Sequence, residues 1–177
     1  IKCALNHTHW EVCPGDLFRI LLTVQLRNTA SKLRTTVFST AGIDDQNDDL
    51  VSVMMPFGPE FIPVYAALQE AATGIGLKCH RADEIWINHH VMQDIVDLIS
   101  KAKVVVCDCS GRNPNVFYEI GISHSLGKEV ILITRSADDI PFDLRHLRYL
   151  SYLPNKQGLE ELRGGVQARL KTLTGKT

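Results

Sequence analysis

From about residue 50 onward, short apolar runs alternate with longer amphipathic segments, and this alternation restricts the chain to a small set of folds. The clearest apolar runs are Val104–Cys107 and Glu129–Thr134. Continuous β-branched runs of this kind are typical of parallel strands that are covered on both faces. Strands that alternate with helices form a mainly parallel sheet with right-handed crossovers. The sequence therefore predicts a three-layer α/β domain.

Hydrophobic periodicity gives expected bounds for the elements of this domain. We expect strands at 51–55, 77–80, 104–107, 129–134 and 147–152, and helices at 60–73, 91–102, 115–126 and 158–173. In the helix at 91–102, Val91 and Ile95 lie on the apolar face and Asp94 lies outside it. Pro114 fits the first position of the next helix, so Asn113 is its expected N-cap. Five mainly parallel strands separated by helices predict a flavodoxin-like (Rossmann-like) sheet.

The first part of the chain is predicted to lie outside this domain. Residues 1–48 show no clear alternation, and the acidic run Asp44–Asp49 has the composition of a solvated linker. The chain begins with Ile rather than Met, which indicates a piece of something longer. We therefore expect residues 1–48 to be an appendage or the tail of a missing domain, and residues 49–177 to be the α/β domain.

Composition excludes several classes of protein. The 177 residues carry 19 Lys and Arg against 20 Asp and Glu, so there is no global field to attract nucleic acid in general. No apolar run approaches the roughly 20 residues that a membrane span needs, which predicts a soluble protein. Five cysteines without regular spacing do not indicate a disulfide framework, and a cytoplasmic location is favoured.

The sequence predicts neither a cofactor nor a metal ion. Phosphate-binding loops of the Walker type, the GxGxxG fingerprint and the GxSxG elbow are all missing, so kinase, dehydrogenase and α/β-hydrolase functions lack support. Near the N-terminus, four side chains of metal-binding type stand close together: Cys3, His7, His9 and Cys13. Their spacing matches no common zinc signature, so we interpret them as a chance grouping.

The densest polar cluster, Asp108–Glu119, follows a predicted strand and enters a predicted helix. Ligands of doubly wound sheets bind beyond the carboxyl ends of the strands. The start of the helix favours a phosphate or another anion, and Arg112 can supply a forked donor to the same group. Asp108 and Glu119 can face one cleft, and a carboxylate pair suits cleavage of a glycosidic bond. The alternative is that both acids serve only to cap and solvate.

Three segments resemble the nucleoside 2-deoxyribosyltransferase-like superfamily. They are VSVMMPFGPEF at 51–61, KVVVCDCSGRNPNVFYEIGISHSLGKEVILIT at 103–134 and PFDLRHLRYLSY at 141–152, and NPNVFYEIG is the most specific part. This superfamily also includes nucleotide N-glycosidases, and nucleotide-binding TIR-like domains are related to it. The resemblance covers about residues 50–152 and implies the same flavodoxin-like fold.

The resemblance also implies roles for individual residues. Glu119 matches the nucleophilic glutamate that attacks the anomeric carbon, and Asp108 matches the acid that holds sugar hydroxyls or helps to protonate the base. Asp94 is the nearest match to a further acidic residue, about one residue out of register. The turn that wraps sugar and base corresponds to Met55, Pro56, Phe57, Gly58 and Pro59. Phe57 stands where classical transferases have an aromatic hydroxyl, which favours glycosidic cleavage over base exchange.

The remaining binding candidates are Ser110, Gly111, Arg112, Asn113, Asn115 and Tyr118. Tyr118 either orients a carboxylate, stacks on a base or packs in the core. The predicted function is cleavage or transfer at the N-glycosidic bond of a nucleoside or nucleotide. Alternatives are cleavage of NAD, non-catalytic nucleotide sensing within a larger regulatory or defence protein, and a protein-interaction module. The expected partner is a small nucleoside or nucleotide, with no membrane, and a homo-oligomer is left open.

Overall fold

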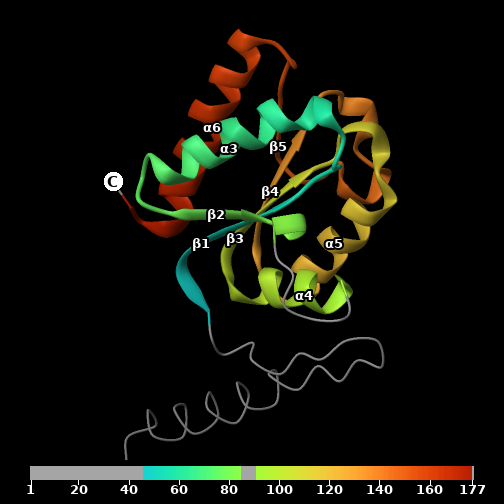
Figure 1. Cartoon of the computed structure of the whole chain (residues 1–177). Helices are drawn as coiled ribbons and strands as arrows, with labels where there is room; N and C mark the ends of the chain where they lie inside the picture. The colour runs from blue at the N-terminus through green and yellow to red at the C-terminus, as the bar shows by residue number, and fades with distance from the viewer. Residues whose placement is uncertain (1–45, 85–90, 177) are drawn as a thin grey trace, which may run out of the picture. The chain divides into compact units, whose positions relative to one another are not determined.

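The computed structural model describes residues 46–84 and 91–176 (Figure 1). Contacts divide the chain into residues 1–40 and 41–177, and the first of these units lies outside the described residues. The N-terminal appendage and the Cys and His group within it therefore stay predictions. The described residues all belong to the second unit, residues 41–177.

Five parallel strands form one sheet in the order β2-β1-β3-β4-β5. Their bounds are β1 Asn47–Met54, β2 Lys78–Arg81, β3 Ala102–Asp108, β4 Glu129–Thr134 and β5 Tyr149–Ser151. Strand β3 lies at the centre, with Val51 of β1 opposite Val104 on one side and Ile131 of β4 opposite Val106 on the other. This order is the flavodoxin-like one, so the predicted fold class is confirmed.

Helices cover both faces of the sheet. On one face lie α3 (Ile62–Thr73) and α6 (Lys156–Thr174), and on the other α4 (Val91–Lys101) and α5 (Pro114–Ser125) (Figure 1). Short 3-10 helices occur at Pro59–Phe61, Ala82–Glu84, Ser110–Arg112, Ala137–Asp139 and Phe142–Leu144. Because most of the 3-10 turns and connecting loops follow strands, the carboxyl edge of the sheet carries most of its irregular structure.

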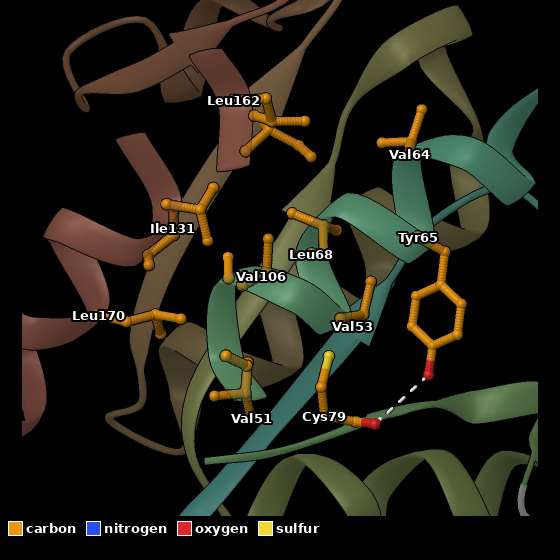
Figure 2. Packing of buried hydrophobic residues seen from close by; sticks show 14 of the residues in the cluster. Val51, Val53, Val64, Tyr65, Leu68, Cys79, Val106, Ile131, Leu162 and Leu170 are labelled. Carbon is orange, nitrogen blue, oxygen red and sulfur yellow. Dashed lines mark hydrogen bonds between the residues drawn. The ribbon is translucent and has the colours of Figure 1, made fainter. Parts of the chain in front are cut away.

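A cluster of buried hydrophobic residues fills the space between the sheet and the pair α3 and α6 (Figure 2). Strand residues Val53 and Val106 meet Leu68 of α3 and Val166 of α6, and all four are almost fully buried. Each buried side chain of this size contributes about 1.5–3 kcal/mol relative to its exposed state. The core therefore holds the carboxyl edge of the sheet in place against two helices.

Two local predictions are wrong. Residues Asn47–Asp49 are not a linker but the exposed start of β1, where Asp48 pairs with Lys103 at 2.9 Å and Asp49 with Lys176 at 2.6 Å. In α4, Asp94 is buried, with 3% exposure, while Val91 is 68% exposed. The helix is covered by the sheet and by α5, so its buried face is wider than the apolar stripe alone indicates.

Candidate functional site

A cleft of about 480 Å³ opens at the carboxyl edge of the sheet. Its described lining residues come from the loop and 3-10 helix after β1, the segment after β3 and the residue after β4: Pro56, Glu60, Phe61, Ser110, Gly111, Arg112, Asn113, Pro114, Asn115 and Arg135. The volume lies in the range of small-molecule sites. This position, beyond the ends of β1, β3 and β4, is where the fold class predicts a ligand.

Backbone geometry brings the segment after β3 into the cleft. Gly111 has φ of 71° and Arg112 has φ of 54°, so the chain turns sharply through two left-handed residues. Such a conformation favours glycine and strains an arginine. Asn113 then begins α5, and its Oδ1 accepts a hydrogen bond from Asn115 N at 3.0 Å. The predicted cap is confirmed, with Pro114 at the first helical position.

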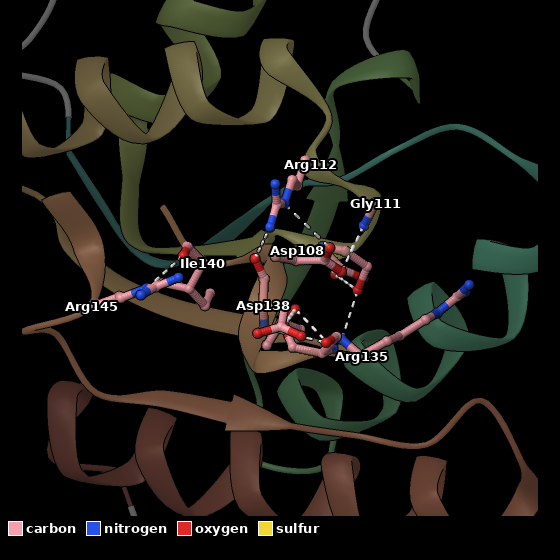
Figure 3. A network of polar contacts seen from close by, with 11 residues as sticks. Asp108, Gly111, Arg112, Arg135, Asp138, Ile140 and Arg145 are labelled. Atoms are coloured by element: carbon pink, nitrogen blue, oxygen red, sulfur yellow. Dashed lines mark hydrogen bonds and ion pairs between the residues drawn. The ribbon is translucent and has the colours of Figure 1, made fainter. Parts of the chain in front are cut away.

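Arg112 is held by the 3-10 helix Ala137–Asp139 (Figure 3). Its Nη2 donates to Asp138 O at 2.5 Å, and its Nε lies 3.8 Å from Asp139 Oδ1. The other oxygen of Asp139 accepts from Gly111 N at 3.0 Å. The positive charge of Arg112 is therefore partly balanced by a carboxylate of the protein itself.

Arg135 is the cleft residue that the motifs did not single out. Its Nε donates to Tyr152 Oη at 3.2 Å and its Nη2 to Glu60 O at 3.0 Å. Its guanidinium lies 4.2 Å from the centre of the Phe61 ring, a cation–π distance. Its position in the sequence is a signal that could have identified it, because Arg135 directly follows the predicted strand 129–134 and ligands bind at strand ends in this fold.

Asp108 lies beneath the cleft as a fully buried acceptor, with 0% exposure. Its Oδ1 accepts from Ser110 N at 3.0 Å and from Ser110 Oγ at 2.5 Å, and its Oδ2 accepts from Tyr152 Oη at 2.6 Å. Burial raises the pKa of Asp108, while these hydrogen bonds and the nearby Arg135 act to lower it. Three donors converge on one carboxylate, which suits a structural anchor.

Glu119 lies on α5, one turn beyond Asn115 and on the same face of the helix. It is buried, with 6% exposure, and its carboxylate has no hydrogen bond with any residue the structure describes. Burial raises the pKa of Glu119 to about 7. Desolvation is the cause of this shift, because burial disfavours the charged form of a carboxylate.

The two predicted catalytic acids approach the cleft from different faces of the sheet. Strand alternation places Asp108 with Val104 and Val106 on the face covered by α3 and α6, whereas Glu119 comes from α5 on the opposite face. In the described part of the chain, neither carboxylate lines the cleft. The structure therefore does not bring the two carboxylates together over this cleft, and the catalytic roles of Asp108 and Glu119 stay predictions.

The structure brings six predicted binding residues together: Pro56, Ser110, Gly111, Arg112, Asn113 and Asn115. The other predicted residues of the first loop lie differently. Met55 is buried in the core, and Phe57 is 60% exposed with Arg81 at 5.6 Å from its ring centre. Gly58 lies against the folded-back carboxylate of Glu60, and a Cβ at this position would overlap with Oε2.

Two further predicted residues lie away from the described lining of the cleft. Tyr118 is 53% exposed, so it does not pack in the core, while Asp94 is buried within α4. Within residues 46–84 and 91–176, no group of three or more His, Cys, Asp or Glu is arranged to hold a metal ion. None of the helices in these ranges has the length and apolar character to cross a bilayer.

No protein-family model and no curated protein sequence matches the chain. Among solved structures, it is similar to a 2-deoxyribosyltransferase from Leishmania mexicana, with 16% identity and a TM-score of 0.45 over 50% of this chain. It is also similar to rubredoxin oxygen:oxidoreductase from Desulfovibrio gigas, with 13% identity and a TM-score of 0.48 over 74% of this chain. The chain spans 65% of the first structure and 37% of the second. Its assignment to the flavodoxin-like class rests on its own strand order.

Proposed function

We propose that this chain cleaves or transfers at the N-glycosidic bond of a nucleoside or nucleotide, with Glu119 as the nucleophile. The observation that carries the proposal is a buried carboxylate with a raised pKa and no hydrogen bond from the described residues, one helical turn beyond the cleft. Acids with a pKa perturbed by desolvation, when they lie beside a cleft, are candidates for catalysis. The resemblance of NPNVFYEIG to the deoxyribosyltransferase-like superfamily supports the same residue.

The geometry of α5 supports a route from Glu119 to the cleft. Side chains on a helix tilt toward its N-terminus. The side chain of Glu119 therefore extends toward the turn that carries Asn115. Asn115 lines the cleft and Glu119 follows it on the same face. A sugar seated at the start of α5 would therefore have the carboxylate below it.

The chemistry proceeds in two balanced steps. Ionised Glu119 attacks the anomeric carbon, the carbon–nitrogen bond breaks, and the base leaves with the bonding electrons and takes up a proton from solvent water. Water, or a second base, then attacks the same carbon and gives up a proton to the solvent, the glycosyl ester breaks, and Glu119 regains its carboxylate. Because burial raises its pKa to about 7, the reactive ionised form becomes more abundant as the pH rises through neutrality.

Chromatography of free base after incubation with deoxynucleosides, ribonucleosides, their 5′-monophosphates and NAD tests this proposal. We expect base release by the wild type and a loss of at least about a hundredfold in Glu119→Gln. Glu161→Gln, at an exposed position of α6, controls for the loss of one carboxylate. A second base added as acceptor separates transfer from hydrolysis. Equal base release by the wild type and Glu119→Gln would remove Glu119 from the mechanism.

Nucleotide sensing without cleavage is the second candidate. It is favoured by the burial of Asp108, whose oxygens already accept three hydrogen bonds and do not face the described cleft. A sensor would raise its melting temperature with nucleotides and release no base from any member of the panel. An interaction module would show neither effect.

A further inference from the structure

We propose that Arg135 is the phosphate-binding residue of the cleft, and that buried Asp108 acts as its positioning residue through Ser110 and Tyr152. This inference rests on the proposed function, since it states which substrate class the site prefers: phosphorylated nucleotides over nucleosides. It gives Asp108 a role different from contact with the sugar or base.

The two arginines of the cleft differ in the balance of their charge. Arg112 lies 3.8 Å from Asp139, and its Nη2 is bonded to Asp138 O. Arg135 donates only to neutral oxygens, those of Tyr152 and Glu60, and within the described residues it forms no ion pair with a carboxylate. An incoming anion would therefore not have to displace a directly paired carboxylate at Arg135, whose charge is balanced by buried Asp108, which it does not contact directly.

Glu60, whose backbone carbonyl contacts Arg135, carries a carboxylate that does not remove this difference. Its carbonyl oxygen accepts from Arg135, but its carboxylate is folded against Gly58. Glu60 lines the same cleft, but its carboxylate is not paired with Arg135.

Arg135 is also held in one orientation before any ligand binds. Its backbone N donates to Ser110 Oγ at 2.9 Å, and its guanidinium lies over Phe61 while two of its groups, Nε and Nη2, are bonded. A guanidinium has five N–H donors, so donors remain for a phosphate. Figure 3 shows Arg135 extending away from Asp138, unlike Arg112.

Asp108 supports this orientation from below. Both groups that contact Arg135 at the level of the sheet, Ser110 Oγ and Tyr152 Oη, donate their protons to Asp108. Their lone pairs are thereby left to accept from Arg135 N and Nε. When Asp108 is ionised, its negative charge also attracts the guanidinium of Arg135. The same attraction acts to lower the pKa of Asp108. The start of α5, which favours anions, lines the same cleft.

Calorimetric titration with deoxyadenosine 5′-monophosphate, deoxyadenosine and inorganic phosphate tests the inference. The wild type is expected to bind the monophosphate at least about tenfold more tightly than the nucleoside, as one charge-assisted hydrogen bond allows. Arg135→Gln should abolish this preference, while Arg112→Gln should keep most of it. Arg145→Gln, outside the described lining of the cleft, controls for net charge. Binding of inorganic phosphate alone separates a free-phosphate site from a nucleotide site.

The positioning role has its own readout. Asp108→Asn and Tyr152→Phe should reduce the preference for monophosphate and leave the affinity for deoxyadenosine unchanged, whereas a merely structural loss would weaken both equally. If Arg135→Gln fails to fold, Arg135→Lys decides, because lysine keeps the charge but loses the bond to Tyr152 and should show a reduced preference.

Three results would overturn the inference: no preference in the wild type, full preference in Arg135→Gln or Arg135→Lys, or loss of preference in Arg112→Gln alone. If Asp108→Asn and Tyr152→Phe lower the affinities for deoxyadenosine and for its monophosphate equally, the positioning role is overturned. Base release from deoxyadenosine by the wild type would leave the proposed glycosidic cleavage standing in each case.

Discussion

The hydroxyl of Tyr152 donates a hydrogen bond of 2.6 Å to Asp108 Oδ2, which joins residues 44 positions apart in the sequence. The bond links the end of β3 to the residue after β5, on opposite sides of β4. Both partners are buried, with 0% exposure for Asp108 and 4% for Tyr152. A polar contact enclosed by an apolar core therefore lies beneath the cleft.

The energetic coupling of this pair can be measured directly. Tyr152→Phe removes one of three donors and should cost about 1–3 kcal/mol of stability. Asp108→Ala leaves the hydroxyls of Ser110 and Tyr152 without their acceptor and should cost more, about 2–6 kcal/mol for the two groups together. The double variant should cost less than the sum of the two, because both changes break one network. Urea denaturation of the four proteins gives the cycle, and strictly additive losses would contradict the network.

Glu119 should make the protein less stable as the pH rises. Its pKa is about 7 in the folded chain against an ordinary value of 4.5, so between these pH values the unfolded chain releases a proton that the folded chain keeps. The free energy of unfolding should therefore fall from about pH 4.5 to pH 7 by about 3 kcal/mol, and then level off.

Glu119→Gln should lack this decrease and be the more stable protein at pH 8. Denaturation at a series of pH values measures the difference, with Glu161→Gln as the matched control at an exposed position. A parallel dependence on pH in the wild type and Glu119→Gln would contradict the raised pKa.

The described cysteines should be inert in the folded protein. Burial raises the pKa of Cys79 and Cys109 to about 12 and that of Cys107 well above its usual range. Thiolates are the reactive form, so alkylation at pH 8 should be slow until urea unfolds the domain. Mass spectrometry of the individual peptides measures each site separately. Rapid modification of Cys107 under native conditions would show that the sheet opens there.

The two asparagine caps should contribute similarly to stability and differently to binding. Asn113 caps α5 and Asn155 caps α6, where its Oδ1 accepts from Gly158 N at 2.8 Å. Replacing either with Ala should cost about 1 kcal/mol. Only Asn113 lines the cleft, so only Asn113→Ala should change nucleotide affinity, as measured by titration beside chemical denaturation. Asn113→Asp should retain the cap.

Local sequence determined the layers of this protein and the start of helix α5. The apolar run Glu129–Thr134 predicts β4 with its observed bounds, because burial on both faces of a parallel strand requires continuous apolar residues. Asn113 and Pro114 predict the start of α5, because capping depends only on neighbouring residues. Six of the predicted binding residues lie in the cleft because they follow strand ends.

Tertiary structure alone decided the charges and partners within the site. Arg135 becomes a cleft residue because Tyr152, Ser110 and Glu60 converge on it from distant parts of the chain. The raised pKa of Glu119 results from desolvation, which depends on how closely α5 packs on the sheet. Sequence periodicity describes which face of an element is apolar, but hydrogen bonds and desolvation depend on groups that meet only after the chain has folded.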